Sequence, residues 1–155
     1  MKKSLFWIGV MMPMCTNSAP LLNYFTLGPI IHWNSSSSGI KLSGGFEASY
    51  WTYRENSNLN LPNIYQPGYG IDMGFEFERA KFRVYCEPEM SWMVEGASLG
   101  PVFEYRRVER NSGIGFQCSL WPLWLPIVDF RYRITRNEET IAPGVFAKIP
   151  LRISY

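Results

Sequence analysis

The chain has 155 residues, of which 16% are aromatic and 18% charged, so it has the length of one domain and not the composition of a disordered chain. Its formal net charge of +2 comes from basic residues scattered along the sequence, which gives no indication of a nucleic-acid-binding stripe. No apolar run approaches the roughly 20 residues that a membrane-spanning helix needs.

The first nineteen residues have the features of an export leader. Lys2 and Lys3 are followed by an apolar stretch, Leu5–Met14, and then by small and polar residues up to Ala19. We therefore predict an export leader at residues 1–19 and a single domain at residues 20–155. The alternative interpretation of the apolar stretch is a first buried strand or a helix.

The rest of the sequence alternates between apolar and polar residues with a period of two, which is the pattern of β-strands. The clearest case is the run from Tyr69 to Glu78, in which every second residue is apolar or aromatic. The pattern predicts eight strands and no helix, at Tyr24–Trp33, Ile40–Tyr53, Tyr69–Glu78, Lys81–Met93, Leu99–Val108, Ile114–Leu120, Ile127–Ile134 and Val145–Tyr155.

Three connections between these strands are distinctive. Arg54–Gly68 is polar, rich in Asn and Pro, and predicts the longest loop. Glu95–Ser98 predicts a turn, and Thr135–Gly144 predicts a charged loop before the last strand.

Eight consecutive antiparallel strands predict an all-β fold, an up-and-down (meander) β-barrel, because closure pairs both edge strands of the sheet. Alternation alone does not decide which face lies inside. In a lipocalin-like barrel the apolar rows point inward, and in a membrane barrel they point outward to lipid.

The last segment, Val145–Tyr155, is apolar at every second position and ends on the aromatic Tyr155. It resembles the closing strand of bacterial outer-membrane β-barrels of the small, eight-stranded OmpA-like and OmpX-like type. The resemblance implies the outer membrane of a diderm bacterium, contact with membrane lipid, and recognition of the closing strand by the barrel-assembly machinery.

The rows of the other strands favour the same orientation. The apolar rows are nearly free of charge, and the opposite rows carry acids and bases in similar numbers, as charges that pair in an interior would. Aromatic residues near the strand ends predict the girdles of a membrane barrel. The predicted membrane-facing residues are Phe46, Phe75, Phe103, Phe130, Ile149, Leu151, Ile153 and Tyr155. The predicted interior charge network consists of Glu47, Asp72, Glu76, Arg83, Glu87, Glu104, Arg106, Asp129, Arg131, Arg133, Lys148 and Arg152.

Few residues indicate catalysis or metal binding. His32 is the only histidine, which excludes a His-based metal cluster, and no cofactor is predicted. A hydrolase would use His32 as base, a serine such as Ser43 or Ser49 as nucleophile and Glu47 to orient the ring, and some lipid-modifying outer-membrane barrels are enzymes of this general kind. A single inward-pointing histidine is more often a structural residue held by hydrogen bonds than a catalytic base. Cys86 and Cys118 fall on non-adjacent strands, so we predict two free, buried thiols.

These patterns predict a small outer-membrane barrel with a charge-plugged interior and a structural, adhesive or assembly role, and not an open pore. The alternative is a secreted or periplasmic lipocalin-like barrel that binds a small apolar ligand. The third interpretation is an outer-membrane lipid-modifying enzyme. No nucleic-acid partner is predicted.

Overall fold

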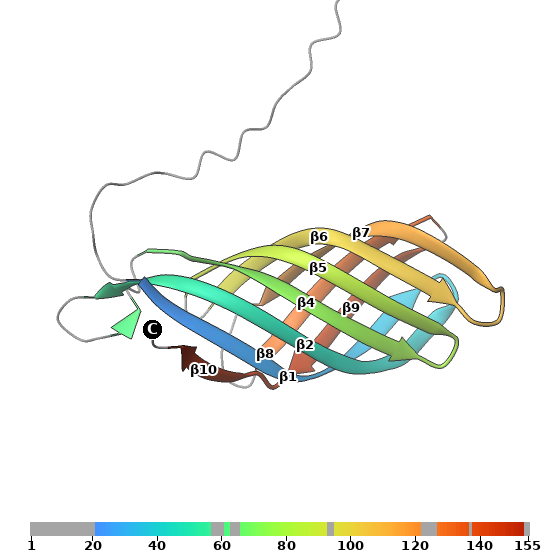
Figure 1. The fold of residues 1–155 in the computed structure, drawn as a ribbon. Helices are drawn as coiled ribbons and strands as arrows, with labels where there is room; N and C mark the ends of the chain where they lie inside the picture. Colours follow the sequence, from blue (N-terminus) through green and yellow to red (C-terminus); the bar gives the residue numbers. More distant parts are fainter. Residues whose placement is uncertain are drawn as a thin grey trace, which may run out of the picture.

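The computed structural model describes residues 21–56, 61–62, 66–92, 95–121, 127–136 and 138–153. These residues form a single antiparallel β-barrel, and none of them forms a helix long and apolar enough to cross a membrane (Figure 1). The strands are β1 (Leu21–Ser36), β2 (Gly39–Asn56), β3 (Leu61–Pro62), β4 (Gly68–Glu78), β5 (Lys81–Trp92), β6 (Glu95–Arg106), β7 (Asn111–Trp121), β8 (Ile127–Thr135), β9 (Glu139–Phe146) and β10 (Ile149–Ile153).

The barrel closes because β1 pairs on one side with β2 and on the other with β9 and β10. The register of β1 is the same on β9 and β10, since Ile30 lies opposite Phe146 and Leu27 opposite Ile149. The break between β9 and β10 lies opposite Pro29 of β1. Proline has no N–H group, so it cannot donate a hydrogen bond to the closing strand at this point. We therefore regard β9 and β10 as one closing strand, and the two-residue β3 lies outside the barrel.

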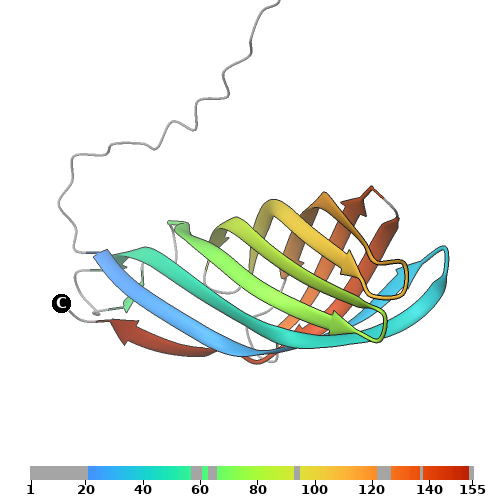
Figure 2. The same cartoon turned by 45° about the vertical axis from the view of Figure 1, so that its right-hand side comes forward.

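The predicted fold class, an eight-stranded antiparallel meander barrel, is thereby confirmed. Following the residue pairs once around the barrel leads from Phe25 back to Ser35, ten residues further along β1. Such a stagger makes the strands tilt against the barrel axis, by about 40° in barrels of this kind. The tilt is visible in Figure 2.

The two ends of the barrel differ. At one end, here called the turn end, short turns connect β1 to β2, β4 to β5, β6 to β7, and β8 to β9. Gly39 has a φ of 100° in the first of these turns, a conformation that favours glycine. At the opposite end, here called the terminal end, β1 begins and β10 ends, close to each other in Figure 1.

Two predicted connections are wrong. Glu95–Ser98, predicted as a turn, belongs to β6, and most of Thr135–Gly144, predicted as a charged loop, is β9. Both segments have small or polar inward residues, so the alternation of apolar and polar residues is not visible in the sequence. The glycines are required because large side chains fill the space beside them: a Cβ at Gly96 would lie 2.4 Å from the Trp121 ring, and a Cβ at Gly144 would lie 2.0 Å from the His32 ring.

Some predictions lie outside the described residues. They are the export leader at residues 1–19, the aromatic end at Tyr155, and the side chains of Arg152 and Ile153.

Candidate functional site: the charged barrel interior

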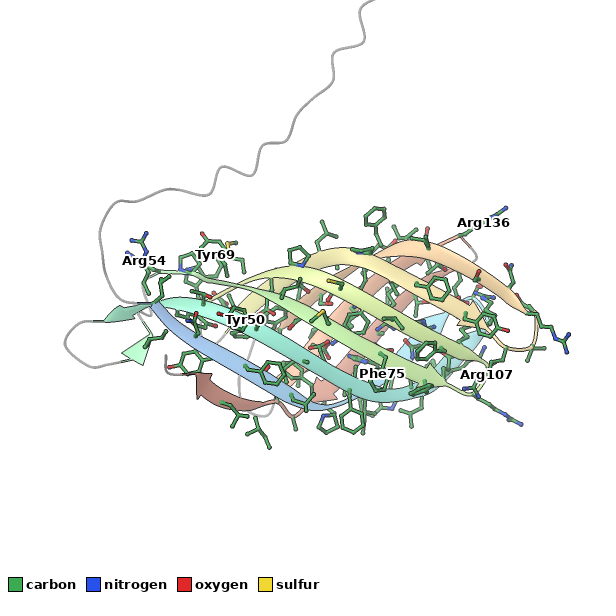
Figure 3. All side chains as sticks on the ribbon, viewed as in Figure 1. Tyr50, Arg54, Tyr69, Phe75, Arg107 and Arg136 are labelled. Carbon is green, nitrogen blue, oxygen red and sulfur yellow. The ribbon has the colours of Figure 1, made fainter. Side chains whose placement is uncertain are left out.

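The barrel wall has two chemically different faces. Charged and polar side chains point into the barrel and are buried, and large apolar side chains point outward and are exposed (Figure 3). Nine predicted interior residues are at most 2% exposed: Glu47, Asp72, Glu76, Arg83, Glu87, Glu104, Asp129, Arg131 and Arg133. Lys148 has a side-chain exposure of 5%, and Arg106, with 14%, lies at the mouth of the turn end. The alternation is sufficient to assign these residues to one row.

Several interior residues were not assigned to the network from the sequence. They are Glu78, Lys81, Glu89 and Gln117 from strands, and Glu138 from the turn before β9. The alternation places the first four in the charged or polar rows of their strands, although the predicted network does not include them. Glu138 could not be found in this way, because it lies outside a strand.

The centre of the interior is organised by Arg131 of β8. Its guanidinium group binds three carboxylates from three different strands, with N–O distances of 2.6 Å to Glu47, 2.6 Å to Asp129 and 3.4 Å to Glu76. The same group lies over the Tyr85 ring, 4.8 Å from its centroid. One fully buried cation therefore links β2, β4 and β8 across the barrel.

Glu76 of β4 is the corresponding hub among the acids. Besides Arg131, it contacts Arg133 of β8, and it accepts a hydrogen bond of 3.0 Å from the Ser43 hydroxyl of β2. The His32 ring of β1 fits between Glu76 and Asp129, with N–O distances of 3.3 Å and 2.9 Å. Each of these carboxylates thus has more than one donor, as buried charges require.

A second group of ion pairs fills the turn end. Arg83 contacts Glu104 at 2.9 Å and Glu78 at 3.2 Å, and Arg106 contacts Glu104 at 2.9 Å. Glu138, in the turn before β9, also belongs to this group. Its carboxylate is bound to Lys81 and lies 3.2 Å from the Arg106 guanidinium group. Burial raises the pKa of the Glu138 carboxyl, but the hydrogen bond and charge of Lys81, with the charges of Arg106 and Arg83, outweigh it and hold that pKa below its usual value.

Toward the terminal end, the described side chains include more acids than bases. Lys148 is bound to Ser49 at 2.6 Å, Asp72 at 3.1 Å and Glu47 at 2.5 Å. Among the described side chains, the hydrogen-bond donors to Glu87 are the hydroxyl groups of Ser98 (2.8 Å) and Ser119 (3.0 Å).

Glu89 is the exception in this section. Within the described residues, neither of its buried carboxyl oxygens has a hydrogen-bond partner.

An aromatic layer closes the terminal end. The Trp51 and Trp121 rings stack with centroids 6.2 Å apart, and Tyr53 packs against Trp51 at 5.8 Å. The Tyr53 hydroxyl lies 2.7 Å from that of Ser91, and Phe146 completes the buried cluster. The interior thus consists of ion pairs over most of its length and of aromatic rings at one end.

Of the two serines proposed as nucleophile, Ser43 lies opposite His32 on β2, and its hydroxyl donates a hydrogen bond to Glu76 and accepts one from Asn34. Ser49 lies opposite Thr26, six residues before His32 on β1, which places Ser49 about 20 Å from His32 at about 3.3 Å per residue. Ser49 and Glu47 both bind Lys148, and His32 binds other carboxylates. The arrangement is that of a histidine used as a structural link. In the described part of the chain, no three His, Cys, Asp or Glu residues form a group that could hold a metal ion.

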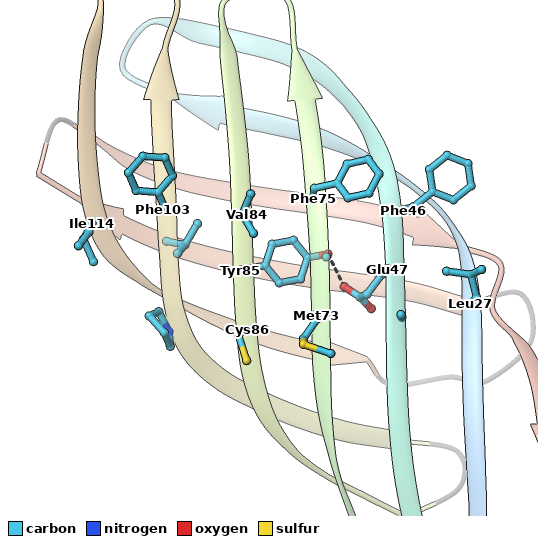
Figure 4. A pocket seen from close by; sticks show the side chains of 14 residues that line it. Leu27, Phe46, Glu47, Met73, Phe75, Val84, Tyr85, Cys86, Phe103 and Ile114 are labelled. Atoms are coloured by element: carbon cyan, nitrogen blue, oxygen red, sulfur yellow. Dashed lines mark hydrogen bonds between the residues drawn. The ribbon is translucent and has the colours of Figure 1, made fainter. Parts of the chain in front are cut away.

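Figure 4 shows both faces of one part of the wall. Tyr85 points inward and donates a hydrogen bond to Glu47, whereas Phe46, Phe75 and Phe103 lie on the outer side and are 37–50% exposed. Gly74 makes room for the Tyr85 ring, because a Cβ there would lie 2.3 Å from the tyrosine oxygen. Most residues that line the pocket in the figure are apolar residues of the outer face.

The two cysteines belong to the outer face as well. Cys86 and Cys118 are free, as predicted, and lie on β5 and β7 with β6 between them. Each is half-buried, so the prediction that they are buried is wrong. They sit in the outward rows, where neighbouring side chains cover only part of each thiol.

The chain matches no family model, and no curated protein or solved structure is significantly similar to it. Its function is therefore argued from the geometry of the barrel.

Proposed function

We propose that this chain is a small β-barrel of the outer membrane of a diderm bacterium, with a charge-plugged interior and a structural, adhesive or assembly role. The observation that carries the proposal is the distribution of polarity, with ion pairs inside and apolar side chains outside. A water-soluble barrel has the opposite need, because its exterior faces water and its interior must exclude it.

The outer apolar surface extends around the barrel. Leu27 on β1, Met73 on β4, Phe116 on β7 and Ile141 on β9 are all more than half exposed. A continuous apolar surface of this extent is rare on soluble monomers and matches a protein that contacts lipid.

The height of this surface fits the hydrocarbon region of an outer membrane. On β2 the outward residues run from Ile40 to Tyr50. At about 3.3 Å per residue and a tilt of about 40°, they span about 25 Å along the barrel axis. The apolar band of membrane barrels has about the same height.

Exposed aromatic residues lie near both edges of the band. Tyr50, Tyr69 and Trp92 lie toward the terminal end, and Trp33 and Tyr105 lie toward the turn end. Their amphipathic rings suit the boundary between hydrocarbon and headgroups, where membrane barrels have aromatic girdles. We propose that these residues form the two girdles.

A plugged interior follows from the narrow barrel and its contents. An eight-stranded barrel has room only for its own side chains, and here these are large. Among the described side chains, nine carboxyl groups (Glu47, Asp72, Glu76, Glu78, Glu87, Glu89, Glu104, Asp129 and Glu138) face six lysines and arginines (Lys81, Arg83, Arg106, Arg131, Arg133 and Lys148). Opening a pore would separate these pairs, so we propose a barrel that does not conduct.

The position of the connections supports a structural or assembly role over that of a surface receptor. The turns between strands are short at the turn end, whereas the longest connection, between β2 and β4, lies at the terminal end. The predicted loop Arg54–Gly68 overlaps the end of β2, β3 and the first residue of β4. If the terminal end faces the periplasm, little chain is left outside the cell to bind a partner. The proposed partners are then membrane lipid and, during insertion, the barrel-assembly machinery that recognises the closing strand.

The two other interpretations have less support. A lipocalin-like binder of an apolar ligand needs an apolar interior, and the described interior is charged. A lipid-modifying enzyme needs a base that activates its nucleophile, whereas His32 contacts Asp129 and Glu76 and the Ser43 hydroxyl opposite it donates to Glu76.

Two measurements test the proposal. The protein should fractionate with outer membranes and show a heat-dependent change of mobility on a detergent gel, whereas a secreted lipocalin-like barrel would appear in the soluble fraction. In planar bilayers the pure protein should give no stable single-channel steps. Large, regular steps would contradict the plugged interior.

A further inference from the structure

The turn end carries a set of exposed arginines. Arg79 lies in the β4–β5 turn, Arg107 and Arg110 in the β6–β7 turn, and Arg136 in the β8–β9 turn, and all four are exposed. We call these four residues the arginine rim. The labelled Arg107 and Arg136 lie at this end in Figure 3, and the labelled Arg54 lies at the opposite end.

The arginine rim is not neutralised by the protein. The ion pairs at this end involve Lys81, Arg106 and Glu138, and within the described residues none includes a guanidinium group of the rim. Of the exposed acids nearby, Glu109 is paired with Arg106, and Glu139 accepts a hydrogen bond from Tyr132. The rim therefore presents an excess of positive charge to its surroundings.

One rim residue is held against its backbone preference. Arg110 has a φ of 50°, in the left-handed region where glycine or asparagine is more common. Glycine would relieve this strain, and the position has an arginine instead. Strained residues of this kind are often found where the side chain has a task.

The rim also has a defined level relative to the apolar band. The exposed aromatics Trp33 and Tyr105 mark the edge of the band at the turn end, and the rim residues follow directly beyond the strand ends. If the barrel spans a membrane as proposed above, this level is that of the lipid headgroups. Successive turns are two strands apart, about 10 Å, so each turn can meet a separate headgroup.

We propose that the arginine rim binds the phosphate groups of anionic lipid headgroups in the leaflet next to the tight turns. The planar guanidinium group donates two parallel hydrogen bonds to phosphate oxygens, which makes arginine well suited to this ligand. Paired binding at several turns would fix the depth and rotation of the barrel relative to that leaflet. The inference rests on the proposed membrane location but adds a ligand class and a binding surface to it.

The test uses the full protein folded into two kinds of vesicle, pure phosphatidylcholine and phosphatidylcholine with phosphatidylglycerol. Spin-labelled lipids of both types report how much of each is retained at the protein surface. Wild type should retain the anionic lipid several-fold more strongly than the zwitterionic one, and the preference should fall with rising NaCl. The variant with all four rim arginines changed to glutamine should lose the preference, and the control Arg54→Gln, at the other end, should keep it.

The outcomes separate the two proposals. A four-fold variant that inserts, shows the heat-dependent mobility and keeps the full lipid preference would overturn the arginine rim but not the membrane barrel. Failure of wild type to insert into either vesicle would overturn both. Inorganic phosphate should weaken retention no more than NaCl at equal ionic strength, and a specific loss in phosphate would show a site for the free ion and not for the headgroup.

Discussion

Removal of the Arg131 guanidinium group should cause a large loss of stability. In Arg131→Met the side chain keeps much of its bulk but no longer binds Glu47, Asp129 and Glu76, which lie at 2.6 Å, 2.6 Å and 3.4 Å. Removing one partner of a buried ion pair typically costs about 3–5 kcal/mol, because the remaining charge is left without compensation.

The structure indicates a loss at the lower end of this range. Each of the three carboxylates keeps another cation or donor, because Glu47 still binds Lys148, Asp129 still binds His32, and Glu76 still contacts Arg133. We therefore expect the free energy of unfolding to fall by about 3 kcal/mol. Urea titration of the protein in lipid vesicles, followed by tryptophan fluorescence and by the heat-dependent mobility, measures this quantity.

A matched control is available in the same interior. Glu89 is a buried acid, and neither of its carboxyl oxygens has a hydrogen-bond partner within the described residues. Glu89→Gln keeps the shape of the side chain and removes a buried carboxyl group that no described donor compensates, so this variant should be as stable as wild type or more so. Equal stability of Arg131→Met and wild type, or a larger loss in Glu89→Gln than in Arg131→Met, would refute the reasoning.

Three further predictions concern other parts of the barrel. Met73→Arg, near the middle of the proposed apolar band, should lower stability in vesicles by about 2–4 kcal/mol, and Leu151→Arg, near the terminal edge, by about 0–1 kcal/mol; equal losses would argue against this membrane placement. Thiol labelling in denaturant without reductant should modify both Cys86 and Cys118, and a blocked pair would contradict their separation by β6. Because the pKa of Glu138 is lowered in the folded state, its stabilising effect is complete above the unfolded pKa of about 4.3 and is lost as the pH falls through the folded value. Stability measured from pH 6 to pH 3 should therefore fall less in Glu138→Gln than in wild type, and parallel curves would contradict the role of Glu138.

The buried acids of the interior differ in how many cations contact them. Glu87 and Glu89 have no lysine or arginine in hydrogen-bond contact within the described part of the chain, whereas Glu76 is contacted by several. Among the described side chains, cations therefore gather around Glu76 and not around Glu87 and Glu89. Stability should depend more on the central Arg131 group than on the acids beside the aromatic layer.

The sequence by itself determined the strands and their faces. Since side chains alternate strictly along a strand, a run such as Tyr69–Glu78 separates into an apolar row and a charged row without any knowledge of the fold. Where the inward residues are small, as at Gly96 and Gly144, the alternation is lost and the strand starts were missed. Their size is set by partners on other strands, which a local pattern does not contain.

The tertiary structure alone decided which charges meet. Arg131 and Glu47 are 84 residues apart in the chain, and their contact depends on the stagger that accumulates around the closed barrel. A change of register on one strand would bring a different row of residues to the level of Arg131. The direction of the apolar rows is likewise a property of the closed barrel, because alternation distinguishes two faces and only closure decides which of them is inside.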